Sequence, residues 1–152
     1  MAAPKEIVFM SQSRAEAYDP RPTDAIISIT DRDKPPADLY RGWCAELRIS
    51  FDDVNPIEFP VDPDEGLLEI QEEQIQQIAT FVLSLPENCE TVAVHCRFGQ
   101  SRSAGVARAV CHHFGLYFPP DYDCFNNFVF TRVRDALRSK SGAELGAAPN
   151  PS

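Results

Sequence analysis

The chain has 152 residues, of which 43% are hydrophobic and 24% are charged, so it has the size and composition of one globular domain that buries its own core. Its formal net charge of −9 argues against binding to nucleic acid or to an anionic membrane, because both require a basic face, and no apolar run approaches the roughly 20 residues of a membrane span. The N-terminus lacks the apolar core of a signal peptide, and five irregularly spaced cysteines are typical of free thiols in a reducing compartment, so we expect a cytoplasmic protein.

The first part of the chain predicts three strands and one helical turn. Residues 7–10 are a short apolar run that fits an edge strand, and residues 11–18 fit a helical turn with Ser13 as its cap. Residues 25–30, AIISIT, are a β-branched run with few polar breaks, which is typical of an interior parallel strand. Residues 47–51 alternate apolar and polar side chains, which is the pattern of a half-buried strand.

An acidic loop and an amphipathic helix come next. Residues 52–64 hold three prolines and five acidic residues, which predicts an irregular segment. Asp62, Pro63 and Glu65 together predict a helix start, because a capping carboxylate precedes a proline in the first turn. The following residues, to Leu85, place apolar side chains on one stripe with Glu and Gln between them, so this helix has one buried and one solvated face.

The last part of the chain predicts a strand, a loop and two helices. Residues 91–95 form a buried strand, residues 96–102 a tight loop, and a helix follows that ends near Phe114; the final helix carries Phe125, Val129, Val133 and Leu137. We expect a domain over residues 1–138 and a disordered tail over residues 139–152. Strands that alternate with helices predict a single-domain α/β fold with a mostly parallel central sheet flanked by helices, in which ligands sit at the carboxyl ends of strands.

The loop over residues 96–102 combines a thiol with a guanidinium. Cys96 is followed by five residues and then by Arg102, where the next helix opens. Backbone N–H groups of such a turn point inward, and the helix N-terminus adds partial positive charge. This arrangement holds a dianionic phosphate and favours the thiolate form of Cys96. A nucleophile placed beneath a bound phosphate indicates a phosphatase.

The segment His95-Cys96-Arg97-Phe98-Gly99-Gln100-Ser101-Arg102-Ser103 resembles the signature of the cysteine-dependent protein tyrosine phosphatase superfamily and is most similar to its small dual-specificity branch. The order of predicted elements over about residues 25–114, and the last helix led by Asn126, resemble the same branch. The resemblance implies a protein tyrosine phosphatase-like fold. It also implies hydrolysis of phosphotyrosine, with phosphoserine and phosphothreonine as further candidates, on a phosphorylated protein substrate without a cofactor. The oligomeric state is open, and a monomer is our default expectation.

The resemblance also assigns roles to the residues of the loop. Cys96 is the nucleophile that forms a phosphocysteine, and Arg102 grips two phosphate oxygens with its planar fork. His95 holds the loop and helps to keep Cys96 ionised, and Ser103 donates a hydrogen bond to the departing thiolate. The remaining residues of the predicted phosphate-binding loop are Arg97, Phe98, Gly99, Gln100 and Ser101.

A carboxylic acid must protonate the leaving oxygen, and the family takes it from the loop after the strand that precedes the long helix. Alignment on residues 47–53 puts Asp53 in that role, with Asp52 next in line and Asp62 or Asp64 still open. The sequence departs from the family's pattern here, since it has no Trp-Pro-Asp triplet.

Other interpretations remain at this point. The same scaffold serves phosphoinositide or RNA 5′-phosphate phosphatases, although this loop has no lysine and long polyanions are disfavoured by the acidic balance. A catalytically inactive phosphopeptide-binding module and a sulfur-transfer enzyme are further alternatives. Cys89 and the run Cys111-His112-His113 lack the ligand spacing of a zinc site, so we predict no metal.

Overall fold

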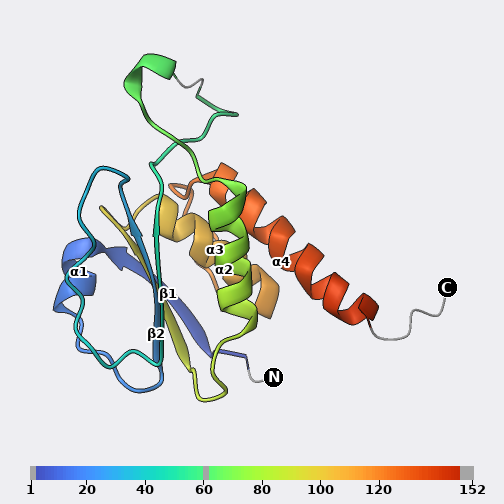
Figure 1. Ribbon diagram of the computed structural model, residues 1–152. Helices are drawn as coiled ribbons and strands as arrows, with labels where there is room; N and C mark the ends of the chain where they lie inside the picture. The colour runs from blue at the N-terminus through green and yellow to red at the C-terminus, as the bar shows by residue number, and fades with distance from the viewer. Residues whose placement is uncertain (1–2, 60–61, 148–152) are drawn as a thin grey trace.

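Four parallel strands make the central sheet of the computed structural model, which describes residues 3–59 and 62–147 (Figure 1). The strands lie in the order β1-β4-β2-β3, so β4 and β2 are interior and β1 and β3 are edges. Their bounds are Glu6–Ser11 for β1, Asp24–Thr30 for β2, Ala45–Ser50 for β3 and Thr91–Cys96 for β4. The predicted α/β fold with a mostly parallel sheet is confirmed, because every strand pairing in the described residues is parallel.

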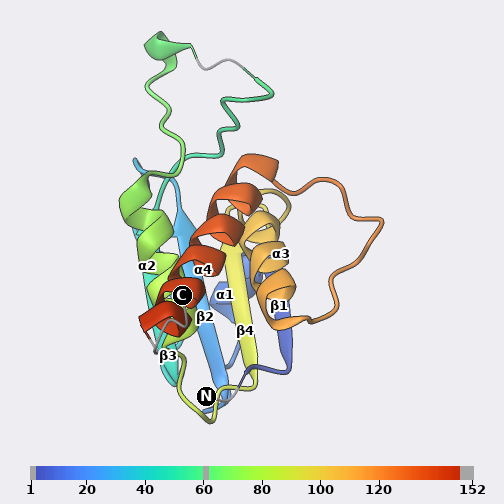
Figure 2. The same ribbon diagram turned by 90° about the vertical axis from the view of Figure 1, so that its right-hand side faces the viewer.

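Helices cover both faces of this sheet. The short helix α1 lies on one face, while α2, α3 and α4 pack together on the other (Figures 1 and 2). Their bounds are Gln12–Ala17 for α1, Glu72–Leu83 for α2, Arg102–Phe114 for α3 and Asn127–Ala147 for α4. Because both faces are covered, every residue of the interior strands β2 and β4 is buried, which explains why their sequences are mainly apolar on both faces.

Successive side chains of the interior strands point to opposite faces and so enter two cores. Ile27 of β2 and Val94 of β4 belong to the large core beneath α2, α3 and α4. Their sequence neighbours Ile26 and Ala93 belong to a smaller core beneath α1. The apolar residues of each interior strand therefore pack against helices on both faces of the sheet.

The cap of α1 differs from the sequence prediction. Ser11, not Ser13, is the N-cap, and its Oγ accepts a hydrogen bond from the backbone N–H of Arg14 at 3.2 Å. Ser11 is the last residue of β1, so the strand turns directly into the helix and leaves Ser13 inside the first turn.

The start of the long helix also differs. Asp62 caps only the short 3-10 turn Pro63–Glu65, and the chain then leaves helical conformation at Gly66, which has φ 69°. The next residues are irregular; the backbone N–H of Leu68 donates to Asp52 Oδ2 and its carbonyl accepts from the backbone N–H of Asp52, both at 2.9 Å. The helix α2 begins only at Glu72, after a capping box between Gln71 and its third helical residue.

The acidic segment between β3 and α2 extends away from the rest of the molecule, at the top of Figures 1 and 2. Two of its large apolar side chains, Ile57 and Phe59, are 76% and 70% exposed. Phe51 and Ile70, at the two ends of this extended arm, belong to the large core, whereas Ile57 and Phe59 add little to it.

The last helix is longer than the sequence predicted. α4 continues to Ala147, so residues 139–147, expected to be disordered, are helical, and no proline occurs between Pro120 and Pro149. Residues 148–152 of the predicted tail lie outside the described residues, and the boundary after residue 138 stays a prediction.

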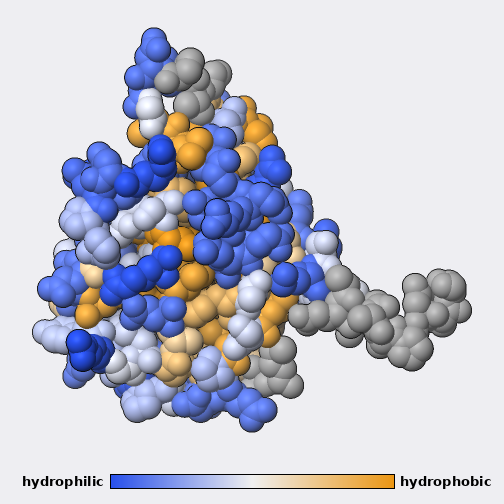
Figure 3. Space-filling model, viewed as in Figure 1, coloured by the Kyte–Doolittle hydropathy of each residue, from blue (hydrophilic) through white to orange (hydrophobic). Residues whose placement is uncertain are grey.

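The surface agrees with the charged composition. Figure 3 shows hydrophilic residues over most of one face of the molecule, with apolar residues gathered in its middle. Among the helices of the described residues, none combines the length and the hydropathy that crossing a membrane requires.

The contact between α3 and the start of α4 depends on a glycine. A Cβ on Gly105 would lie 2.7 Å from the carbonyl oxygen of Asn126 and 3.3 Å from the Cβ of Val129. We expect Gly105→Ala to lower the free energy of unfolding by about 1–3 kcal/mol through overpacking, measured by urea denaturation. Gly142→Ala is the matched control, because nothing lies within 4 Å of its Cβ position, and it should stabilise α4 by about 0.5–1 kcal/mol. Equal stabilisation by both variants would contradict this account.

Candidate active site

The loop over residues 97–101 joins β4 to α3 and is fixed against neighbouring segments. Its Gly99 has φ 70°, and a Cβ there would lie 2.3 Å from the backbone of Met10 and Ser11 at the end of β1. The backbone N–H of Gln12 donates to the carbonyl of Arg97 at 3.3 Å. The turn therefore takes a left-handed residue without a side chain, as only glycine allows.

Cys96 lies at the last position of β4 and is 2% exposed. Its Sγ lies 3.1 Å from Oγ of Ser103, which is fully buried in the first turn of α3. The thiol donates to the hydroxyl in this contact, and a thiolate would accept from it instead. The structure thus brings together two of the residues that the sequence pattern singled out.

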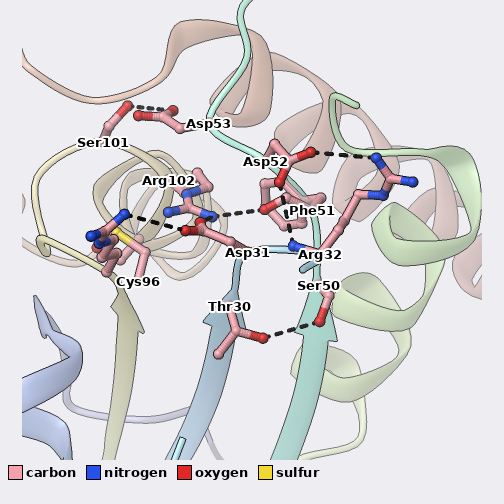
Figure 4. Close-up of polar contacts among 12 residues, drawn as sticks. Thr30, Asp31, Arg32, Ser50, Phe51, Asp52, Asp53, Cys96, Ser101 and Arg102 are labelled. Atoms are coloured by element: carbon pink, nitrogen blue, oxygen red, sulfur yellow. Dashed lines mark hydrogen bonds and ion pairs between the residues drawn. The ribbon is translucent and has the colours of Figure 1, made fainter. Parts of the chain in front are cut away.

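Arg102 is a buried cation, 4% exposed, at the first position of α3. Its Nη1 donates to the carbonyl oxygen of Phe51 at 2.7 Å and forms an ion pair with Oδ1 of Asp31, also at 2.7 Å. Asp31 and Phe51 directly follow β2 and β3, so the ends of these two strands meet at this guanidinium. Figure 4 shows Cys96 and Arg102 at the same end of the sheet as Asp31 and Phe51.

The sequence predicted no role for Asp31. A signal was available, because Asp31 follows an interior strand and ligand-binding groups of parallel sheets gather at the carboxyl ends of strands. Its Oδ2 also lies 3.8 Å from Nη1 of Arg97, so one carboxylate faces both arginines of the loop.

The other edge of the Arg102 guanidinium lacks a hydrogen-bond partner at its Nε among the described residues, and this atom is buried. Nε–H and one Nη2–H point in the same direction, which is the fork that binds two oxygens of a phosphate or carboxylate. An unpartnered buried donor costs about 1–3 kcal/mol, and a bound oxyanion would supply the missing acceptor.

His95 is completely buried in β4 behind the loop. Its Nε2 lies 2.6 Å from Oγ of Ser28 on β2, and its Nδ1 lies 3.5 Å from the carbonyl oxygen of Cys96. Burial lowers the pKa of His95, so the imidazole is neutral near pH 7. Its contacts support the expected role in holding the loop, whereas a neutral ring adds no positive charge beside Cys96.

The two neighbouring acids after β3 point to different partners. Asp53 is exposed, and its Oδ1 accepts hydrogen bonds from Ser101 Oγ at 2.8 Å and from Asn126 Nδ2 at 3.0 Å. Asp52 is 7% exposed and holds the acidic segment through Leu68 and an ion pair with Arg32 at 3.5 Å. Only Asp53 of this pair contacts the loop that follows Cys96.

The other acids that the sequence left open lie elsewhere. Asp62 accepts from the backbone N–H of Asp64 at 2.9 Å at the 3-10 turn of the extended arm. Among the acids considered, the contacts favour Asp53 as the group beside the candidate site.

Three loop residues lie at the rim. The Phe98 ring is 68% exposed, and the guanidinium of Arg97 packs over it at 5.0 Å from the ring centroid. The side chain of Gln100 is exposed, while its carbonyl accepts from the hydroxyl of Tyr122. The sequence did not predict this hydrogen bond, because Tyr122 lies in the loop between α3 and α4 and no local pattern links it to the loop over residues 97–101.

Hollows flank the loop on two sides. One, of about 430 Å³, is lined by Arg97 and Asp31 together with residues of α1 and of the loop after β2. Another, of about 280 Å³, is lined by Asp53, Ser101 and Asn126 together with residues of the extended arm. Within residues 3–59 and 62–147, no group of three His, Cys, Asp or Glu side chains is arranged to hold a metal ion.

Comparison with known proteins adds a likeness to solved structures. No family model and no curated protein matches the sequence. The structure is similar to the crystal structure of human DUSP28, with 18% sequence identity, a TM-score of 0.45, and coverage of 90% of this chain and 94% of that chain. A likeness of this size bears on neither the reaction nor the substrate.

Removal of Asp31 should destabilise the fold, because Arg102 is buried and Asp31 is its ion-pair partner. We expect Asp31→Ala to lower the free energy of unfolding by about 3 kcal/mol, because it leaves Arg102 with an uncompensated buried charge. Urea denaturation measures the change. Asp33→Ala, at an exposed position of the same loop, is the control and should change stability by less than about 0.5 kcal/mol. Equal effects of the two variants would mean that the ion pair does not hold Arg102.

The stability of the fold should depend on pH through His95. In the unfolded chain His95 takes up a proton near the ordinary histidine pKa of about 6.5. In the folded protein it does so only at a lower pH, because burial lowers the pKa of His95. The contribution of His95 to the free energy of unfolding is therefore fully present above about pH 6.5. It declines as the pH falls below that value, by up to about 1.4 kcal/mol per pH unit.

Urea unfolding between about pH 5 and pH 7.5 measures this slope, and His95→Gln should reduce it. His113, whose pKa is also lowered by burial, provides the comparison, since His113→Gln removes only its own part. An unchanged slope in His95→Gln would show that His95 is not the group responsible.

Proposed function

We propose that the protein is a cysteine-dependent phosphatase that hydrolyses phosphotyrosine, and phosphoserine and phosphothreonine as well, through a phosphocysteine intermediate. One observation carries this proposal: the buried Arg102 keeps its Nε edge without a partner at the end of the sheet where Cys96 lies. A tetrahedral dianion supplies the acceptor oxygens for this edge and for the loop amides.

The first step transfers the phosphoryl group to sulfur. The Cys96 thiolate attacks phosphorus, the bond from phosphorus to the leaving oxygen breaks, and its electron pair stays on that oxygen. Asp53, as the carboxylic acid, gives its proton to the leaving oxygen, so a phenol or alcohol departs and phosphocysteine remains. The hydrogen bonds from Ser101 and Asn126 to Oδ1 orient Asp53 for this transfer through its other oxygen.

The second step releases inorganic phosphate. Water attacks phosphorus, the Asp53 carboxylate takes the water's proton, and the bond from phosphorus to sulfur breaks with its electron pair on Cys96. Ser103 donates its hydroxyl proton into a hydrogen bond with the departing thiolate, for which the 3.1 Å separation is suitable. Arg102 binds two of the three equatorial oxygens and stabilises their negative charge in both steps.

The alternatives from the sequence receive less support. Phosphoinositides and RNA 5′-ends are larger polyanions, and the chain carries a net charge of −9. An inactive phosphopeptide-binding module would not need a carboxylic acid beside the loop, yet Asp53 is held there by two donors.

Turnover of an aryl phosphate tests the proposal. We expect the protein to hydrolyse p-nitrophenyl phosphate with a metal chelator present and to be inhibited by vanadate, which occupies the same cradle. Cys96→Ser should abolish turnover but still bind vanadate in a titration, because the loop amides and Arg102 remain. Turnover that persists in Cys96→Ser would show that the thiolate is not the nucleophile.

The acid is tested with variants of the same segment. Asp53→Ala should lower turnover of p-nitrophenyl phosphate by about 10²-fold and remove the fall in rate that accompanies ionisation of the acid. Asp62→Ala and Asp64→Ala, on the exposed arm, are the controls and should keep the wild-type profile. If Asp62→Ala or Asp64→Ala removes this fall in rate at higher pH and Asp53→Ala keeps it, the assignment of the acid is wrong.

A further inference from the structure

The hollow of about 430 Å³ beside Arg97 has no part in the phosphoryl transfer described above. We call it the α1 hollow; its lining residues are Gln12, Ser13, Glu16, Asp31, Lys34, Pro35 and Arg97. It shares Asp31 and Arg97 with the candidate active site, where Asp31 forms ion pairs with Arg97 and Arg102. A group bound in this hollow therefore lies next to the bound phosphate.

The carboxylates that line the α1 hollow are already engaged. Glu16 Oε2 accepts from the backbone N–H of Asp38 at 2.8 Å and from Gln12 Nε2 at 3.1 Å, and these hydrogen bonds lower the pKa of Glu16. Asp31 is paired with Arg102 at 2.7 Å. Both carboxylates therefore have partners from the fold itself.

The cations that line the hollow keep unused donors. Lys34 is exposed, and its amine forms no hydrogen bond or ion pair with the described residues. Arg97 is 57% exposed in its side chain, and its ion-pair contact with Asp31 is long, at 3.8 Å. The lining thus offers donors that lack acceptors, which suits an anionic group.

The hollow of about 280 Å³ beside Asp53 differs from the α1 hollow, because its charged lining residues are all acidic. The carboxylates of Glu58 and Asp123 join Asp53 in its lining, and no lysine or arginine is present in that lining. A second anion on a substrate is repelled there and attracted toward α1, so the charges orient a substrate across the loop.

We infer that the α1 hollow is a subsite for an acidic side chain that flanks the phosphorylated residue of a peptide substrate. Lys34 and Arg97 bind the flanking carboxylate while the loop binds the phosphate. The inference rests on the proposed function for turnover, but binding alone also tests it. Because the chain as a whole is acidic, the preference comes from this local pair of cations and not from the overall charge.

The test compares phosphotyrosyl peptides that carry Glu or its neutral isostere Gln on either side of the phosphotyrosine. Affinity is measured with the Cys96→Ser variant, and kcat/KM with the wild type, relative to p-nitrophenyl phosphate. We expect the Glu peptide to be preferred by about three- to tenfold on one side of the phosphotyrosine, and the preference to shrink in high salt.

Lys34→Glu should reverse the preference, so that the Gln peptide binds better. Lys140→Glu makes the same change of charge on α4, on the other face of the sheet, and should keep the wild-type ratio. These two variants separate a local contact from a change in net charge.

The outcomes distinguish this inference from the proposed function. Turnover with equal use of Glu and Gln peptides, or a ratio that Lys34→Glu leaves unchanged, overturns the subsite and leaves the phosphatase standing. Discrimination between the peptides in binding without any turnover upholds the subsite and overturns the proposed phosphatase.

Discussion

The buried guanidinium of Arg102 ties together the parts of the molecule that matter for its chemistry. It begins α3, forms an ion pair with the residue after β2, and donates to the residue after β3. The helix start and the two strand ends come from segments far apart in the sequence, and they meet because β2 and β3 are parallel neighbours in the sheet. The position of the arginine is thus a consequence of the strand order, and in turn its side chain links the carboxyl ends of β2 and β3.

A buried ion pair of this kind is a poor device for stability alone. The loss of hydration of both charges offsets much of their attraction, and well-packed apolar side chains often hold such a position as well or better. The cost is easier to understand if the guanidinium is kept for a ligand, with one edge anchored to Asp31 and Phe51 and the other edge unpartnered. The geometry therefore agrees with a site whose binding group is positioned before the ligand arrives.

Local patterns predicted the elements whose structure is decided locally. The β-branched runs that became β2 and β4, and the loop from Cys96 to Arg102, are recognisable without any partner. Asp31 was missed because its role depends on pairing with a residue about 70 positions away, which no window of sequence contains. The predicted helix start at Asp62 was wrong for a related reason. Its capping pattern is sound, but the turn ends at Gly66, and Leu68 is hydrogen-bonded to Asp52 instead of continuing a helix.

The choice between two adjacent acids shows how packing selects a functional side chain. Asp52 turns inward and is used by the arm, whereas Asp53 turns outward to Ser101 and to Asn126, the residue that precedes α4. Asn126 can reach Asp53 only where α4 approaches α3 closely, and that approach requires the missing side chain of Gly105. A helix contact in the core thereby sets the place of a carboxyl at the surface, so the fold and the candidate site are specified by the same few contacts.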